Sequence, residues 1–341
     1  MRIAILSTIA WRTPPRHYGP WEAVASNITE ELVRRGHEVT LYATGDSQTN
    51  ADLRAVCPRG YEEDPEIIPK VWEALHISNL FEEAGQFDII HNHFDFLPLT
   101  YSSMTRTPVV MTIHGFSSPG ILPVFRKYNN KVHYVSISDA HRADDLSYAA
   151  TIYHGLNMNE FQYQSHAGDY LLFFGRIHSD KGAREAIQIA LGCNKRLVMA
   201  GIIQDQAYFD KYVKPHLTAG RIEYIGSVGP DERSSLLGNA AALLHPIHFE
   251  EPFGLSVIES MACGTPVIAF NKGSMPELIR PGYNGYLVEN VSEAVEAVEN
   301  IPGIRRANCR EHIERYFTVE HMVANYIDTY ERILATTENE R

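Results

Sequence analysis

Short apolar runs alternate with segments of helical periodicity in two successive series, and this alternation constrains the fold more than any other feature. Arg2–Ile9 is a nearly continuous apolar run, and apolar side chains then recur at helical spacing from Trp21 onward. The alternation stops over the polar stretch Asn157–Asp169 and restarts at Tyr170–Phe174. Apolar strands that alternate with helices form parallel sheets covered on both faces. We therefore predict an α/β protein with two doubly wound, Rossmann-like parallel-sheet domains.

The length of 341 residues agrees with two domains, at roughly 150 residues each. We expect an N-terminal domain over residues 1–157 and a C-terminal domain over residues 158–321, with the linker inside Asn157–Asp169. Ligands of doubly wound sheets bind beyond the carboxyl ends of the strands. Two such domains would place the ligand site in a cleft that both face.

The overall charge narrows the class of binding partner, and the spacing of the cysteines indicates the redox compartment. The formal net charge of −12 makes nucleic acid a poor partner, although a local basic pocket for one small anion stays allowed. The four cysteines are far apart, which is typical of a reducing compartment. The chain lacks an apolar run long enough to span a membrane. We expect a cytoplasmic protein with at most peripheral membrane contact.

Three common glycine motifs are absent from the sequence. It has no G-x-G pair, no G-x-x-x-x-G-K-[ST] loop and no G-x-S-x-G turn. These absences argue against NAD-dependent enzymes, P-loop ATPases and α/β-hydrolases.

One candidate site is the loop from Gly175 to Gly182, which follows an apolar strand and leads into a helix. It carries two cations, Arg176 and Lys181. Cations next to the free N–H groups of a helix N-terminus suit a diphosphate. The alternative is a surface loop in which these cations pair internally with Asp180.

A second candidate contains Glu251 and Glu259, which are separated by seven residues. Glu251 falls in a loop that Pro252 and Gly254 shape, and Glu259 falls in the first turns of the following helix. Backbone N–H groups at Gly254 and Leu255 would be free to meet a phosphate. The carboxylates could accept hydrogen bonds from the hydroxyl groups of one ligand, as sugars offer. The alternative is that both acids merely favour the N-terminus of a helix.

The segment EPFGLSVIESMACGTPVIA, followed by SMPELI and NGYLV, resembles the E-x7-E region of glycosyltransferase family 4, whose members have the GT-B architecture. The segments FFGRIHSDKG, HYGPWE, HNHFDF and TIHG support the resemblance, and the closing segment YFTVEHMVANYIDTYERIL is similar to the last helices of the family. The resemblance covers nearly the full length.

The resemblance implies a retaining, metal-independent transferase that moves a sugar from a nucleotide-diphosphate sugar to an acceptor hydroxyl. A UDP-sugar is favoured as donor, then a GDP-sugar, and no cofactor is expected. The acceptor, a glycan, lipid or small metabolite, would bind mainly to the N-terminal domain, and the donor to the C-terminal domain. A final helix over about 322–341 would pack back on the first domain.

The resemblance also assigns roles to residues. Arg176 and Lys181 match positions that hold the diphosphate, Glu251 matches the contact to donor-sugar hydroxyls, Glu259 the contact to the ribose, and His114 the histidine near sugar and phosphate. We take Arg176, Lys181, Glu251 and His114 as the catalytic set. The expected nucleotide-sugar site also includes Gly19, Gly175, Gly201, Val228, Pro252, Phe253, Gly254, Leu255 and Glu259. Where the family often has a second glycine after Gly19, this chain departs from the pattern and has Pro20.

Several residues near the predicted strand ends of the first domain are candidates for the acceptor: Trp11, Arg16, Tyr18, Trp21, His93 and Asp95. The alternative for the first loop is a solvated loop. His91, His93 and Asp95 alternate along one strand end and could ligate a metal, but we favour a polar strand end that lines the cleft. An epimerase, a phosphorylase and a non-catalytic nucleotide-sugar-binding protein remain alternative functions.

Overall fold

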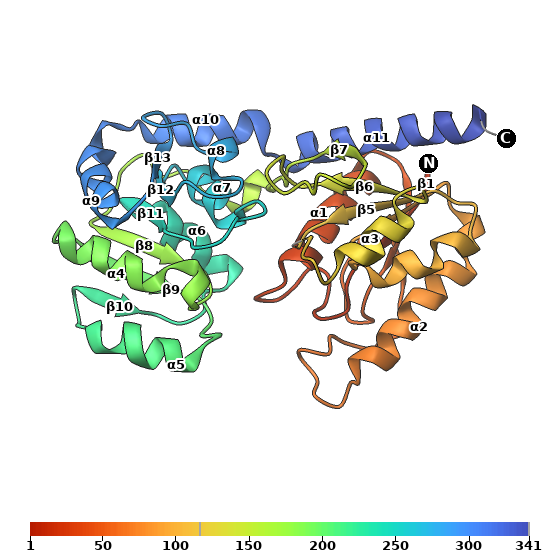
Figure 1. The fold of residues 1–341 in the computed structure, drawn as a ribbon, viewed down its shortest axis with the longest axis horizontal. Coiled ribbons are helices and arrows are strands. Elements are labelled where there is room, and N and C mark those ends of the chain that lie inside the picture. Colours follow the sequence, from red (N-terminus) through yellow and green to blue (C-terminus); the bar gives the residue numbers. More distant parts are fainter. Residues whose placement is uncertain (116, 340–341) are drawn as a thin grey trace. The chain divides into compact units, whose positions relative to one another are not determined.

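The computed structural model describes residues 1–115 and 117–339. The chain divides into two units, Met1–Gly155 with Val319–Arg341 and Leu156–Thr318. We call these unit 1 and unit 2 and describe each by itself (Figure 1). Within the described residues, no helix is long and apolar enough to cross a membrane.

Unit 1 is built on a parallel sheet with the strand order β3-β2-β1-β4-β5-β6-β7. Its inner strands are buried and apolar because helices cover both faces of the sheet; Ile3 and Leu6 of β1, for example, are fully buried. The strands are β1 (Arg2–Leu6), β2 (Glu38–Tyr42), β3 (Asp52–Arg54), β4 (Ile89–Asn92), β5 (Val109–Ile113), β6 (Val132–Ser136) and β7 (Tyr148–Thr151).

Two hydrophobic clusters form the core of unit 1. In one, α2 (Pro69–Glu82) and α3 (Leu122–Tyr128) contribute apolar side chains, and in the other α1 (Pro20–Arg34) and α11 (Val319–Asn339) do so. The last helix, α11, packs beside α1 and buries Tyr326 and Tyr330 completely. The short 3₁₀ segments Ala84–Gln86 and Leu97–Met104 flank β4.

Unit 2 has a second parallel sheet with the strand order β10-β9-β8-β11-β12-β13. The strands are β8 (Tyr170–Phe174), β9 (Arg196–Ala200), β10 (Ile222–Tyr224), β11 (Ala242–His245), β12 (Val267–Phe270) and β13 (Gly285–Val288). The helices are α4 (Ala183–Gly192), α5 (Gln206–Tyr208), α6 (Pro230–Gly238), α7 (Leu255–Ala262), α8 (Met275–Leu278), α9 (Val291–Asn300) and α10 (Arg306–Tyr316). The predicted class, two doubly wound parallel-sheet domains, is confirmed.

The connections between elements differ in detail from the sequence prediction. The division falls after Gly155 and before Val319, whereas we expected it after residue 157 and at about residue 322. The polar stretch from Asn157 is part of unit 2, because Phe161 is buried there. The outgoing and returning segments pair inside unit 2, where the Leu156 N–H donates to the Phe317 carbonyl at 2.9 Å.

Two local predictions are wrong. The helical spacing of apolar residues over Ala207–Leu217 predicts a single helix. The structure instead has α5, a π turn over Phe209–Val213 and a 3₁₀ turn that includes Pro215, where proline cannot continue the helical hydrogen bonding. The apolar neighbours of Cys263 predict that it lies inside a helix, whereas it is the residue that follows the end of α7.

Candidate functional site

Close backbone packing fixes the loop after β8. Gly182 has φ +73°, and a Cβ atom there would lie 1.9 Å from the carbonyl oxygen of Pro246. Gly201, just after β9, has φ +144°, and its Cβ would lie 1.9 Å from the carbonyl oxygen of Gly175. Glycine is therefore required at both positions, and the strand ends of β8, β9 and β11 are held tightly together.

The two cations of this loop have different partners. Arg176 Nη2 lies 3.2 Å from Asp180 Oδ2, and Nη1 of the same guanidinium donates to the side-chain oxygen of Gln204. The internal pairing that the sequence left open therefore exists for Arg176. Lys181 instead reaches Glu251, from which it is 70 residues distant in sequence, with 2.6 Å between Nζ and Oε2.

The Lys181–Glu251 pair is largely withdrawn from solvent, with side-chain exposures of 17% and 12%. Burial by itself would raise the pKa of Glu251, but His245 and the charge of Lys181 outweigh it and lower that pKa to about 2. His245 Nε2 lies 3.5 Å from Oε2, at the limit of hydrogen bonding, so we regard Lys181 as the principal partner. Burial lowers the pKa of His245, which keeps its imidazole neutral at pH 7.

The loop that carries Glu251 is held by Gly273 and Ser274. The Gly273 N–H donates to Glu250 at 2.6 Å, the Ser274 N–H donates to the Glu251 carbonyl at 3.0 Å, and Ser274 Oγ donates to the Phe253 carbonyl at 2.6 Å. Sequence reasoning missed this support, because it treated the segment SMPELI only as part of a pattern. Gly273 has φ +55°, and a Cβ atom there would lie 2.3 Å from the Glu251 nitrogen.

Glu259 lies in α7 and has a partner of its own. Arg233 Nη1 lies 3.0 Å from Glu259 Oε1, while Nη2 of the same arginine lies 3.6 Å from Glu160. Burial raises the pKa of Glu259, although the nearby charge of Arg233 opposes this shift. The two acids of the E-x7-E pattern are thus separately paired, one with a lysine and one with an arginine.

The remaining members of the expected nucleotide-sugar site in unit 2 lie around these pairs in sequence. Gly254 has φ +99° and stands immediately before α7, which Leu255 begins. Pro252 and Phe253 belong to the supported loop and are buried. Val228 lies half-buried between β10 and α6.

In unit 1, four buried imidazoles gather near the carboxyl ends of β4 and β5. His93 Nδ1 lies 2.8 Å from His114 Nε2, and His93 Nε2 lies 3.2 Å from His91 Nδ1. The ring of His114 stacks on Trp21 and on His154, with centroid distances of 5.5 and 5.2 Å. Burial lowers the pKa of His154 to about 3 and the pKa values of the other three well below their usual range.

The histidines contact one another rather than forming an open ligand set. Tyr330 lies 2.6 Å from His91 Nδ1, and Thr112 lies 2.8 Å from His91 Nε2. In the described part of the chain, no group of three or more His, Cys, Asp or Glu side chains is arranged to hold a metal ion.

The first loop of unit 1 is organised around Glu22, which is buried in α1. Thr8 donates to its carboxylate, and the Trp11 N–H donates to the same oxygen at 3.2 Å. Arg16 lies 2.9 Å from Glu63 and 3.2 Å from Asp46. Ion pairs therefore hold part of this loop, although residues 16–18 are exposed to solvent. Tyr18 is 40% exposed and meets Trp11 edge to face, and Gly19 has φ +148°.

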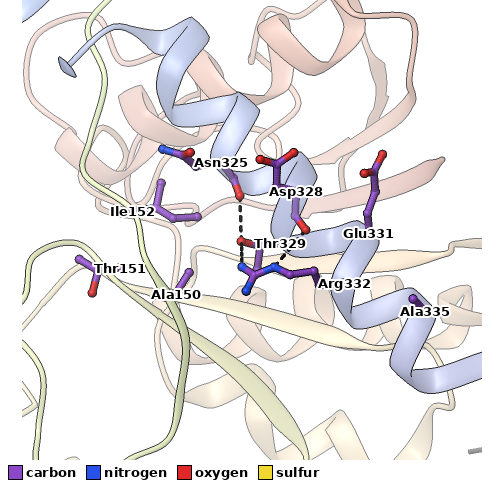
Figure 2. Close-up of a pocket in the computed structure, with 9 residues that line it drawn as sticks. All are labelled: Ala150, Thr151, Ile152, Asn325, Asp328, Thr329, Glu331, Arg332 and Ala335. Atoms are coloured by element: carbon purple, nitrogen blue, oxygen red, sulfur yellow. Dashed lines mark hydrogen bonds between the residues drawn. The ribbon is translucent and has the colours of Figure 1, made fainter. Parts of the chain in front are cut away.

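A groove lies on another part of unit 1. It has a volume of about 730 Å³ and is bounded by β7 and α11 (Figure 2). Arg332 lines this groove. Its guanidinium donates one hydrogen bond to Thr329 Oγ1 at 3.0 Å and another to the Asp328 carbonyl at 3.3 Å. None of the expected site residues lines this groove.

Fold and site together define a parallel α/β protein whose second unit holds paired cations and carboxylates at its strand ends. Residues 159–314 match the family model described as glycosyl transferases group 1, and residues 22–146 match the model of glycosyltransferase family 4. The chain belongs to glycosyltransferase family 4.

Three similar proteins extend over nearly the whole chain. An uncharacterized glycosyltransferase of Methanocaldococcus jannaschii is 23% identical, covering 97% of this chain and 98% of that protein. The solved structure of AviGT4, a glycosyltransferase involved in avilamycin A biosynthesis, is 25% identical with a TM-score of 0.73, covering 98% of both chains. The structure of Anabaena HepE in complex with UDP and glucose is 18% identical with a TM-score of 0.75, covering 97% of this chain and 99% of that one.

Proposed function

We propose that this protein is a retaining glycosyltransferase that transfers a sugar from a UDP-sugar to a hydroxyl of an acceptor without a metal ion. The observation that carries the proposal is the buried Lys181–Glu251 pair, in a chain that belongs to this family. The crystal structures of HepE with UDP and glucose support UDP as the nucleotide. A GDP-sugar is the second candidate for the donor.

In the proposed reaction, the bond between the anomeric carbon and the diphosphate oxygen breaks, and a bond from the acceptor oxygen to that carbon forms. The acceptor's hydroxyl proton passes to the leaving diphosphate, so a protein base is not required. Arg176 and Lys181 would bind the diphosphate and stabilise its growing charge in place of a metal ion. Because attack and departure occur on one face of the sugar, the configuration of the anomeric carbon is retained.

Glu251 would accept hydrogen bonds from hydroxyl groups of the donor sugar, and its lowered pKa keeps it ionised for this purpose. Glu259 would accept hydrogen bonds from the ribose. His114, kept neutral by burial, would donate or accept one hydrogen bond near the sugar and its phosphate.

The first test is binding of UDP, GDP and ADP to the full chain by calorimetry, each with and without EDTA. We expect UDP to bind best and EDTA to have no effect. Arg176→Ala should weaken UDP binding by about 1.5–3 kcal/mol, the loss expected for a charge-assisted contact. The matched control is Arg184→Ala, which removes an equal charge from α4, where the guanidinium stacks on Tyr212 instead.

Turnover separates the alternatives. The proposal expects transfer of the sugar to an added hydroxyl acceptor, with a product of the same anomeric configuration as the donor by NMR. Conversion of a nucleotide sugar to an isomer without acceptor would indicate an epimerase. Binding of UDP with no turnover would indicate a non-catalytic protein, and loss of binding in EDTA would contradict metal independence.

A further inference from the structure

Unit 1 contains a small cavity at the carboxyl ends of β1 and β4. Its volume is about 200 Å³, and its lining includes Thr8, Trp21, Tyr61, Glu73, Asp95 and Phe96. Trp21 and Asp95 were acceptor candidates from the sequence, whereas Tyr61 and Glu73 come from segments that sequence reasoning left without a role. At roughly 30 Å³ for each water molecule in the liquid, this volume corresponds to about six or seven waters. The cavity therefore has room for one sugar-sized ring but not for a longer oligosaccharide.

The backbone presents Asp95 to this cavity in a strained conformation. Asp95 has φ +85°, one of two positive φ values among the described non-glycine residues. Asn92 holds the turn, because its side-chain nitrogen donates to the Asp95 carbonyl and its oxygen accepts from the Phe94 N–H, both at 2.8 Å. Strain of this kind persists where the surroundings enforce it, and it is concentrated at binding sites.

Both carboxylates of the lining are partly desolvated. Burial raises the pKa of Asp95 to about 6, although a backbone hydrogen bond from Phe96 opposes this. Burial also raises the pKa of Glu73, and it raises that of Tyr61 to about 12 with help from the Glu73 charge. In the described part of the chain, neither carboxylate has an ion pair with Lys, Arg or His.

The lining residues favour one kind of ligand. Aromatic rings offer apolar faces to the C–H faces of a sugar ring, and carboxylates accept hydrogen bonds from its hydroxyl groups. The cavity lining contains no cation, so a phosphate or carboxylate here would meet two acids without compensation. Arg16 of the first loop is already paired with Asp46 and Glu63.

We propose that this cavity is the acceptor subsite and that it selects an uncharged monosaccharide or cyclitol ring over its phosphorylated form. This inference depends on the proposed transferase function. Trp21 connects the subsite to the expected donor residues, because it lines the cavity and also stacks on His114. Asp95 is the principal hydrogen-bond acceptor for the ring, and Glu73 is the second.

The test measures binding of myo-inositol and methyl α-glucoside to the full chain by ligand-observed NMR in the presence of UDP, alongside myo-inositol 1-phosphate and glucose 6-phosphate. We expect at least one neutral ring to bind and both phosphorylated rings to bind at least about tenfold more weakly. Asp95→Asn and Glu73→Gln should each weaken the neutral ring by about tenfold. Asparagine also tolerates positive φ, so Asp95→Asn preserves the turn.

The control is Asp52→Asn, which removes a surface acid paired with Arg54 and should leave ring binding unchanged. Transfer assays with the same neutral and phosphorylated rings provide a second measurement. Equal or tighter binding of a phosphorylated ring, unchanged binding in Asp95→Asn, or no binding of either neutral ring would overturn the subsite. If UDP-sugar turnover is absent while the neutral ring still binds in an Asp95-dependent way, the transferase proposal and the acceptor role both fail, and the cavity remains a binding site for a neutral ring.

Discussion

Lys181 Nζ and Glu251 Oε2 lie 2.6 Å apart, although their residues are 70 positions apart in sequence. Both side chains are largely buried, so neither charged group can become hydrated when its partner is removed. The two motifs that the sequence identified separately are therefore one structural unit. Its integrity can be measured without any ligand.

Removing one member of this pair should destabilise unit 2. Lys181→Met leaves the buried Glu251 carboxylate with only the neutral His245 imidazole beside it, and we expect a loss of about 3 kcal/mol at pH 7. The double variant Lys181→Met/Glu251→Gln should recover most of this loss. Denaturant unfolding measures both, with Lys214→Met as control, because that lysine belongs to an exposed pair. Equal stability of the single and double variants would contradict the pairing.

The same pair predicts a dependence of stability on pH. The pKa of Glu251 is about 2 in the folded state, below its ordinary value of 4.5. The unfolded state therefore takes up the proton first, so the stabilisation is fully present above about pH 4.5 and is lost as pH falls toward 2. The difference in melting temperature between wild type and Glu251→Gln should shrink over this range. A constant difference would argue against an ionised Glu251.

Substitution by alanine should have different effects on stability at two glycines of one loop. Gly182→Ala places Cβ against the Pro246 carbonyl and requires φ +73°, so we expect destabilisation of more than about 2 kcal/mol. Gly175→Ala meets no atom within 4 Å and should fold normally, while its methyl group reduces UDP affinity if this loop binds the diphosphate. Thermal unfolding and calorimetry with UDP measure the two effects. Normal stability of Gly182→Ala would contradict the close backbone packing.

Asp95→Asn should stabilise the protein at neutral pH. Burial raises the folded-state pKa of Asp95 from 3.8 to about 6, so the folded state holds its proton longer than the unfolded state. Stability therefore falls as pH rises through this interval, and Asp95 costs about 3 kcal/mol at pH 7.5, at roughly 1.4 kcal/mol per unit of pKa difference. Thermal unfolding of the variant should show this gain at pH 7.5 and little change at pH 4. Destabilisation at pH 7.5 would mean that the Asp95 carboxylate is favourably paired.

The buried histidines should stay neutral through the physiological range. Burial holds the pKa of His154 at about 3 and those of His91, His93 and His114 well below 6.5. NMR signals of these imidazoles should not titrate between pH 5 and 8. Because the unfolded chain protonates them below about 6.5, stability should fall with decreasing pH, and His91→Gln should weaken that dependence. A signal that titrates near pH 6.5 would place its imidazole in solvent.

The sequence by itself determined the fold class and the main motifs. Continuous apolar runs such as Leu171–Phe174 can be buried only in sheets covered on both faces, so the parallel architecture follows from local pattern. Lys181 and Glu251 were found because the chemistry of cations and carboxylates in loops after strands is visible in residue order. The broken helix after Gln206 was missed, because its apolar spacing looked helical.

Tertiary structure alone decided which residues meet. The Lys181–Glu251 contact, the support of the Glu251 loop by Ser274, and the cavity that joins Tyr61 and Glu73 to Asp95 all connect segments distant in sequence. Local pattern cannot supply such contacts, because they depend on which strand ends the sheet order brings together and on how closely glycine backbones pack. Burial then set the charge states of Asp95 and of the histidines, and burial is a property of the folded chain.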